Sequence, residues 1–240
     1  MIDPYEKELV PYLEQFVRHR RRQRMEEVLA NRTRRVTIML EDVYQPHNAS
    51  AVLRTCECLG VQDVHVVEAN NSYHINRDVS LGAGQWLTVR RYPDTLQCVT
   101  SLRAAGYRLV AATPHRADCD LDQLPCTPPV AVMLGTEEAG LSPSALEAAD
   151  LRVRVPIYGF TESYNVSVCA ALMLGDITKK LRRSGTAAVW GLSDSERHAL
   201  RLAWYRASLR GVDQIEARFR RERQAASSGP SPPVGGRQAG

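Results

Sequence analysis

The positions of apolar residues between 36 and 183 predict a regular alternation of β-strands and α-helices. Short apolar runs and period-two segments predict strands at 36–43, 64–69, 86–92, 108–113, 130–134 and 151–157. Apolar residues at helical spacing, together with capping residues, predict helices at 49–59, 95–105, 143–147 and 165–183. Strands that alternate with helices in this way predict an α/β fold, a mainly parallel sheet with helices on both faces.

The two ends of the chain lie outside this pattern. Residues 1–32 predict a basic N-terminal helical arm, and residues 186–224 a basic C-terminal arm with one helix from 194 to 223. The α/β domain is therefore expected at 33–185. Residues 225–240 are rich in Gly, Pro and Ser without apolar periodicity, and we expect this tail to be disordered.

Composition narrows the class of protein. No apolar run reaches the roughly eighteen residues that a membrane helix needs, and the first residues lack the apolar core of a secretion signal. The six cysteines are scattered, and the pair Cys56 and Cys58 has no second pair at zinc-finger spacing. We therefore expect a cytoplasmic protein with reduced cysteines, without a bound metal and without a membrane span.

The net charge of +4 is distributed unevenly along the chain. Residues 1–35 contain nine Lys or Arg against six Asp or Glu, residues 179–240 thirteen against five, and residues 36–178 nine against sixteen. Either basic run alone is also explained by a solvated helix face, but two runs on an acidic body favour a nucleic-acid partner. RNA contacts are expected from Arg20, Arg21, Arg22, Arg24, Arg201 and Arg210.

Three loops that follow predicted strands carry the candidate chemistry. They are 45–50 (QPHNAS), 135–142 (GTEEAGLS) and 156–168 (PIYGFTESYNVSV). Parallel sheets bind ligands at the carboxyl ends of their strands, where these loops are expected to meet. Each loop alone is a weak signal, since Asn48 is also a plausible helix cap and Arg54 a plausible surface residue. Together, N-x5-R from Asn48 to Arg54, GTExxGLS and PxxGxxxSxNVSV form an ordered and specific set.

With these motifs the chain resembles the SPOUT superfamily of RNA methyltransferases, and within it the SpoU/TrmH branch of ribose 2′-O-methyltransferases. The resemblance covers roughly residues 33–183. It implies S-adenosylmethionine as the cofactor, a homodimer and a C-terminal deep trefoil knot, although connections in proteins are rarely knotted. It implies cofactor contacts from Ala112, Thr113, Leu134, Gly135, Val155, Ile157, Gly159, Tyr164, Asn165 and Val166. Tyr164 departs from the family pattern, in which an apolar residue is frequent at this position.

The resemblance also implies catalytic roles for Arg54, Asn48, Glu137, Ser163 and Asn165. A ribose hydroxyl that attacks a sulfonium methyl needs its proton removed or shared. Arginine stays protonated at neutral pH, so Arg54 is expected to orient the target phosphate and stabilise the developing alkoxide; whether it also acts as the base stays open. Ser163 and Asn165 are expected to hold Arg54 and the ribose in register. Glu137 is expected to pair with Arg54 or to fix its loop, and Glu138 to be a surface residue.

The short basic arms resemble those of the tRNA-directed members of the family, which implies a tRNA substrate methylated at the D-loop guanosine of tRNA position 18. The alternatives within the family are 23S rRNA and another tRNA position. An alternative from another class is a non-catalytic RNA-binding protein, which the complete motif set disfavours. A Rossmann-type enzyme is also disfavoured, because the Gly82-Ala83-Gly84 turn does not follow the first strand.

Overall fold

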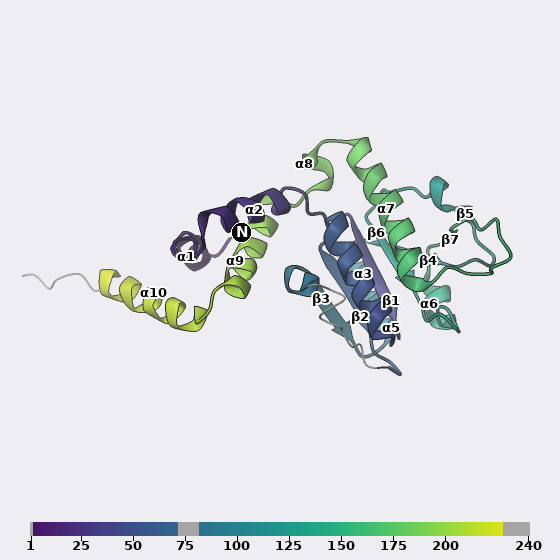
Figure 1. Cartoon of the computed structure of the whole chain (residues 1–240), viewed down its shortest axis with the longest axis horizontal. Helices are drawn as coiled ribbons and strands as arrows, with labels where there is room; N and C mark the ends of the chain where they lie inside the picture. Colours follow the sequence, from purple (N-terminus) through teal and green to yellow (C-terminus); the bar gives the residue numbers. More distant parts are fainter. Residues whose placement is uncertain (1, 72–81, 228–240) are drawn as a thin grey trace, which may run out of the picture. The chain divides into compact units, whose positions relative to one another are not determined.

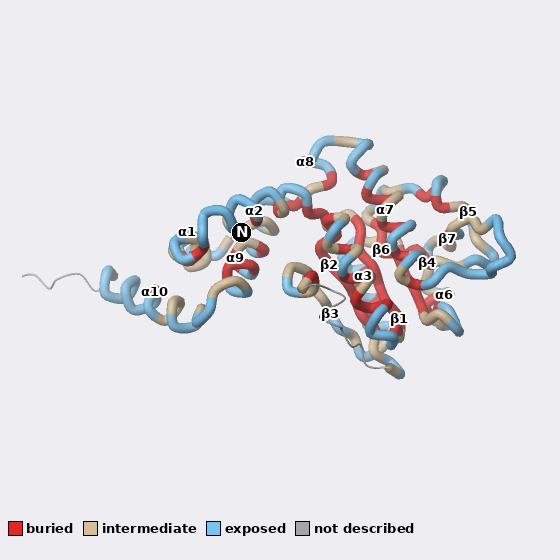
Figure 2. The backbone as a smooth tube through the Cα atoms, viewed as in Figure 1, coloured by how far each residue is buried: buried red, intermediate tan, exposed pale blue. Residues whose placement is uncertain are grey.

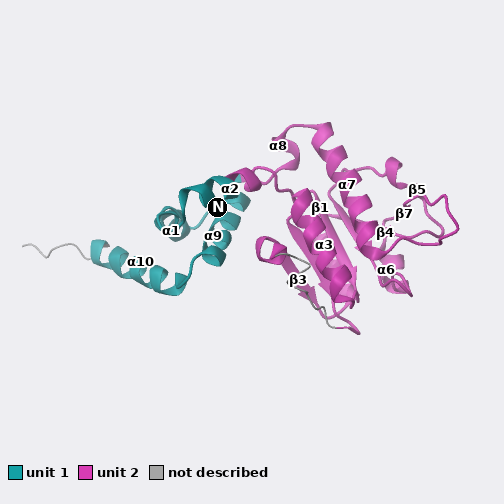
Figure 3. Cartoon of the chain, viewed as in Figure 1, with its two compact units in different colours: residues 1–25, 194–240 teal, residues 26–193 magenta. Residues whose placement is uncertain are grey.

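The computed structural model describes residues 2–71 and 82–227. The chain forms two compact units, a helical unit of residues 1–25 and 194–240 and a sheet unit of residues 26–193 (Figure 3). The expected boundaries at 32 and 185 thus lie inside the sheet unit, which takes in a few more residues at each end. The two terminal segments, expected as separate arms, belong to the same unit.

The sheet unit is built on seven parallel strands in the order β3-β2-β1-β6-β4-β7-β5. The strands are β1 Val36–Glu41, β2 Asp63–Val67, β3 Thr88–Tyr92, β4 Arg108–Ala112, β5 Cys119–Asp120, β6 Val130–Leu134 and β7 Leu151–Arg154. The six predicted strands are present. The two-residue β5 was not predicted, because a strand this short leaves no periodic pattern. The strand expected to end at residue 157 ends at Arg154, before Pro156.

The order of the strands brings distant segments together. From β1 the chain continues outward through β2 and β3, then crosses to β4 on the other side, and β6 later fills the place between β1 and β4. In the β1–β6 register Val36 lies opposite Val130 and Leu40 opposite Leu134. The segments that follow β1 and β6 therefore leave the same edge of the sheet as neighbours, which is the usual ligand position in such sheets.

Helices cover both faces of the sheet (Figure 1). Helices α3 (Pro46–Leu59) and α7 (Val166–Ser184) pack against each other on one face, and α5 (Thr95–Ala104) and α6 (Pro143–Ala148) on the other. Alternate residues of β1 serve the two layers, since Ile38 and Leu40 belong to the α3–α7 core and Met39 to the α5–α6 core. All of the β1 residues are buried, as the red tube in Figure 2 shows.

Local signals explain where several of these elements begin and end. Helix α3 ends at Gly60, whose φ of 78° is left-handed and whose Cβ position would meet the Asn31 carbonyl oxygen. Helix α6 begins after Ser142, whose hydroxyl accepts the Ala145 N–H. The short elements are η1 Ala83–Trp86, η2 Leu121–Gln123 and α8 Ala187–Trp190. The expected strand 86–92 accordingly begins only at residue 88.

The helical unit contains α1 (Pro4–Glu14), α9 (Asp194–Ser208), α10 (Val212–Ser227) and the first part of α2 (His19–Leu29). Its core joins both ends of the chain, because the rings of Tyr5 and Tyr12 pack on Phe219 with centroids 5.5 and 4.9 Å apart. Glu8 pairs with Arg223 at 2.7 Å.

Two expectations for this unit need correction. The single helix predicted for 194–223 was wrong, because the chain breaks into α9 and α10 at Gly211, which has a φ of 66°. Of the expected disordered tail, residues 225–227 belong to α10, and residues 228–240 lie outside the described residues. Among the described helices, none has the length and apolar character of a membrane span.

Candidate active site

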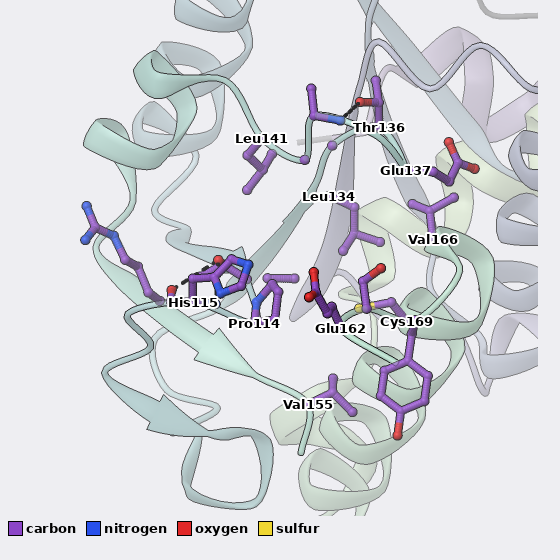
Figure 4. Close-up of a pocket in the computed structure, with 18 of the residues that line it drawn as sticks. Pro114, His115, Leu134, Thr136, Glu137, Leu141, Val155, Glu162, Val166 and Cys169 are labelled. Carbon is purple, nitrogen blue, oxygen red and sulfur yellow. Dashed lines mark hydrogen bonds between the residues drawn. The ribbon is translucent and has the colours of Figure 1, made fainter. Parts of the chain in front are cut away.

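A cavity of about 610 Å³ lies where β4, β6 and β7 end (Figure 4). Its walls come from three segments, 112–116 after β4, 134–141 after β6 and 152–164 along and after β7, with the start of α7 closing it. This volume is in the range of cofactor-sized sites, about 300–1,000 Å³. The strand order explains the position, since β6, β4 and β7 are neighbours in the sheet.

Most of the residues expected to contact the cofactor line this cavity. Those that do are Ala112, Thr113, Leu134, Gly135, Val155, Ile157, Tyr164 and Val166. Gly159 and Asn165 are not among its lining residues. Gly159 is exposed, and a Cβ placed on it would meet nothing within 4 Å, so this position does not require the small size of glycine.

The loop after β6 is a tight turn that only glycine permits at its first position. Thr136 and Gly140 exchange two backbone hydrogen bonds of 3.1 and 3.0 Å, and Gly140 has a φ of 68°. A Cβ on Gly135 would collide with the backbone of Gly140 and Leu141. The bare backbone of Gly135 is thus a requirement of the loop that forms this cavity wall.

A buried carboxylate anchors the far end of the same loop. Glu41, at the end of β1 and 4% exposed, accepts hydrogen bonds from the Ser142 N–H at 2.8 Å and the Ser142 hydroxyl at 2.7 Å, and also from the Thr95 hydroxyl. Sequence reasoning missed this contact, because residues 41 and 142 meet only through the strand order. Glu41 therefore fixes the position at which the cavity loop turns into α6.

The loop after β7 is closed by a side chain that departs from the family pattern. The Tyr164 hydroxyl donates to the Pro156 carbonyl oxygen at 3.1 Å, which ties the two ends of the loop together. Ser163 and Tyr164 line the cavity, whereas Tyr158 and Phe160 at the tip of the loop are almost fully exposed. The phenol at position 164 thus has a local structural role besides its place in the cavity wall.

Three of the expected catalytic residues form one hydrogen-bonded group. The Asn48 amide donates to the Glu137 Oε1 and, at 2.9 Å, to the Gln45 Oε1, and its oxygen accepts from the Asn165 amide at 3.2 Å. Asn165 in turn caps α7 by accepting from the Ser167 N–H at 2.9 Å. The second carboxylate oxygen of Glu137 is buried without a partner in the part of the chain described, and Glu137 lines the cavity.

Arg54 lies apart from this group. It is exposed on α3 and borders a separate shallow hollow together with Ala51, Thr55, Cys58 and Ala171. No hydrogen bond or ion pair of Arg54 occurs within residues 2–71 and 82–227, so the expected pairing with Glu137 is not made; Glu137 binds Asn48 instead. Ser163 and Asn165 likewise do not hold Arg54 in this structure.

Sequence reasoning missed several side chains of the cavity. His115, Glu162 and Cys169 line it (Figure 4), and Arg116 and Arg152 line it as well. Burial raises the pKa of the Cys169 thiol to about 11, so this cysteine is a neutral wall residue at ordinary pH. Glu138 is exposed, as expected, but it also borders the cavity.

The arginines of the terminal segments divide into two groups. Arg20, Arg21, Arg24 and Arg210 are exposed, Arg201 is half-buried, and the half-buried Arg22 pairs with Glu14 at 2.6 Å. Arg32, by contrast, is fully buried and pairs with Glu57 at 3.2 Å, and desolvation lowers its pKa. Part of the basic run at 18–35 is therefore structural.

These features define an α/β enzyme fold with a ligand cavity built from the second and third motif loops and the loop after β4, next to which Asn48 of the first motif loop binds Glu137. The model of the SpoU rRNA methylase family matches residues 35–175, and the chain belongs to this family. In the described residues, no three His, Cys, Asp or Glu side chains cluster as metal ligands do.

Known relatives and structures show the same likeness. The chain is 39% identical to a tRNA (guanosine(18)-2′-O)-methyltransferase of Borreliella burgdorferi, over 85% of this chain and 93% of that protein. The crystal structure of the A. aeolicus TrmH/SpoU tRNA modifying enzyme superposes with a TM-score of 0.72 at 26% identity, covering 80% of this chain and 98% of that one. AviRb of Streptomyces viridochromogenes, solved with the cofactor AdoMet, shares the fold, with a TM-score of 0.55 at 24% identity over 67% of this chain and 62% of that one.

Proposed function

We propose that this chain transfers a methyl group from S-adenosylmethionine to the ribose 2′-hydroxyl of the D-loop guanosine at tRNA position 18. The proposal rests on the cavity in which the second and third motif loops meet. Asn48 of the first motif loop donates a hydrogen bond to Glu137 in the wall of this cavity. Relatives that match most of the chain carry this activity in their names. The alternatives are methylation of 23S rRNA and of another tRNA position. The first is supported by the matching family model, which is described as a family of rRNA methylases.

The cavity suits S-adenosylmethionine in size and in chemistry. Its apolar wall of Leu134, Val155, Ile157 and Val166 suits the adenine, and the bare backbone at Gly135 allows a close approach. The second Glu137 carboxylate oxygen, which is buried without a partner in the described residues, is an unused hydrogen-bond acceptor in a residue of the cavity wall. When bound, the cofactor supplies an activated methyl group.

The residues of the chain have separate tasks in this proposal. Asn48 holds Glu137 in the cavity wall and Asn165 at the start of α7, while Ser163 in the wall offers a hydroxyl to the incoming ribose. Arg54 carries a permanent positive charge that positions the target phosphate and stabilises the alkoxide as the hydroxyl loses its proton. The exposed Arg20, Arg21, Arg24 and Arg210, with Arg22 and Arg201, bind the tRNA backbone.

We further propose that the protein is a homodimer that buries the outer face of α3 and α7. Val168 and Leu172 on α7 are 45% and 41% exposed, and Arg54 borders the hollow that this face forms with Ala171. A second copy on this face therefore places Arg54 in an interface. Light scattering tests this, because Leu172→Glu is expected to yield a monomer; a dimer that persists in that variant refutes the interface.

The proposal also includes a C-terminal trefoil knot and a location in the cytoplasm. The segments 134–141 and 152–164, which a C-terminal knot of this family would interlace, both line the cavity. A tRNA substrate implies that the protein works in the cytoplasm.

The decisive experiment is methylation with labelled cofactor of two tRNA transcripts, one with guanosine and one with 2′-deoxyguanosine at position 18, and of 23S rRNA. Label is expected only in the first transcript. Arg54→Ala is expected to lose turnover while its affinity for S-adenosylhomocysteine stays within about twofold. Label in 23S rRNA alone would favour the alternative substrate, and absence of label and of cofactor binding would favour a non-catalytic RNA-binding protein.

A further inference from the structure

Three basic side chains line the cavity, and most of their donors have no partner among the described residues. His115 and Arg116 lie in the loop after β4, and Arg152 lies on β7. Neither the His115 imidazole nor the Arg116 guanidinium has a hydrogen-bond or ion-pair partner among the described residues. The Arg152 guanidinium donates only to the Leu146 carbonyl oxygen, at a weak 3.4 Å. These groups are therefore available to a ligand.

The loop that presents Arg116 is held in an unfavourable backbone conformation. Arg116 has a φ of 49°, in the left-handed region that a residue with a Cβ rarely adopts. On one side of it, the Thr113 hydroxyl accepts the His115 N–H and donates to the His115 carbonyl oxygen, both at 3.2 Å. Two residues further on, Asp118 is fixed to β7 through the backbone of Arg152, with hydrogen bonds of 2.8 and 2.7 Å. Strained residues that the surrounding structure holds in this way are typical of ligand sites.

Three carboxylates also line the cavity. Glu137 and Glu138 come from the loop after β6, and Glu162 from the loop after β7 (Figure 4). A cavity lined by basic groups from β7 and the loop after β4, and by carboxylates from the loops after β6 and β7, suits a ligand with charges of both signs. The methionyl part of S-adenosylmethionine carries a sulfonium, an ammonium and a carboxylate.

We propose that Arg116, together with His115 and Arg152, binds the carboxylate of the cofactor's methionyl group. This assignment rests on the proposed function and adds the recognition of the cofactor tail to it. A guanidinium with unused donors matches the two oxygens of a carboxylate. An RNA phosphate has similar chemistry, but the cofactor is favoured, because Arg152 is half-buried in the wall of the cavity rather than exposed beside it.

Calorimetric titration with S-adenosylhomocysteine and with its decarboxylated analogue tests the assignment. The exposed Arg116 is the residue to change, because Arg116→Gln removes no side-chain hydrogen bond or ion pair within residues 2–71 and 82–227. This variant is expected to bind S-adenosylhomocysteine about tenfold more weakly and the decarboxylated analogue as the wild type does. Arg154→Gln is the matched control: Arg154 lies on the same strand as Arg152, pairs with Asp120 at 2.8 Å and does not line the cavity. It is expected to leave both affinities unchanged.

Three results would overturn the assignment. Equal weakening of both ligands by Arg116→Gln would indicate a general effect on the cavity. Unchanged affinity for S-adenosylhomocysteine with a raised KM for tRNA would assign Arg116 to an RNA phosphate. Failure of the wild-type chain to bind S-adenosylhomocysteine at all would refute the proposed function itself, which the other two results leave intact.

Discussion

The hydrogen bond between Asn48 and Glu137 makes a specific prediction about how the motif loops depend on one another. Asn48, only 5% exposed, joins the loop after β1 to Glu137 and to Asn165. Asn48→Asp replaces the amide that donates a hydrogen bond to the Glu137 carboxylate by a second carboxylate. Because a hydrogen bond to a charged group contributes about 1.5–3 kcal/mol, and repulsion replaces it here, we expect a loss of at least about 2 kcal/mol of unfolding free energy.

The second change in the test restores the missing donor. Glu137→Gln supplies an amide that donates to the new carboxylate at position 48, which also still accepts from Asn165. In the double variant we therefore expect recovery of most of the loss, a coupling of about 2 kcal/mol in a double-mutant cycle. The free energy of unfolding in urea and the affinity for S-adenosylhomocysteine are the readouts. Turnover is not used, because Glu137 is an expected catalytic residue and its replacement is expected to abolish turnover by itself.

The control for this cycle is the neighbouring carboxylate. Glu138 is exposed and has no hydrogen-bond or ion-pair partner among the described residues, so Glu138→Gln combined with Asn48→Asp is expected to show no coupling. If the effects of Asn48→Asp and Glu137→Gln are simply additive, the two side chains do not support each other, and the account of the three joined motifs is wrong.

Three further predictions concern a buried histidine, the first glycine of the cavity loop and the Glu41 carboxylate. Burial lowers the pKa of His65 from 6.5 to about 4, so on acidification the unfolded chain binds the proton before the folded chain does. The stability that is present above pH 6.5 is therefore lost as the pH falls toward 4. In urea unfolding the wild type should lose about 3 kcal/mol more than His65→Gln over that range. Gly135→Ala should abolish calorimetric binding of S-adenosylhomocysteine, because its Cβ collides with the backbone at 140–141. Glu41→Gln should cost about 2 kcal/mol in urea unfolding, since an amide accepts only part of the hydrogen bonds that Glu41 receives from Ser142 and Thr95. A loss below roughly 0.5 kcal/mol, the scatter of surface substitutions, would contradict this role of the Glu41 carboxylate.

The sequence was sufficient for those elements that have a strong local pattern. The apolar run at 130–134 is a strand as predicted, the strand predicted at 36–43 is present over 36–41, and Ser142 and Gly60 cap helices as their residue types indicate. The break at Gly211 was missed, because a glycine in a helical pattern is compatible with both a continuous and an interrupted helix. Nothing in the local pattern distinguishes these cases; the difference is made by packing of α10 against α1.

Contacts between strands could not be predicted, because they depend on the strand order. Sequential strands are usually neighbours, yet β6 lies between β1 and β4. This insertion brings Asn48 to Glu137, 89 positions along the chain, and Glu41 to Ser142, 101 positions along. The cavity residues His115 and Arg152 were missed for the same reason, since each belongs to the site only because β4 and β7 are adjacent.

The geometry of α3 explains why Asn48 and Arg54 separate although they belong to one motif. Six residues in an α-helix, at about 100° each, place two side chains about 120° apart around the axis. Asn48 faces Glu137 and Asn165, so Arg54 cannot face them as well, and it is found exposed beside Ala171. The N-x5-R spacing thus suits one residue that supports the cavity from within and another that acts outward. A charge that has to reach the reacting ribose from this outward face does so only when a second body, the bound RNA or another copy of the chain, closes over α3 and α7.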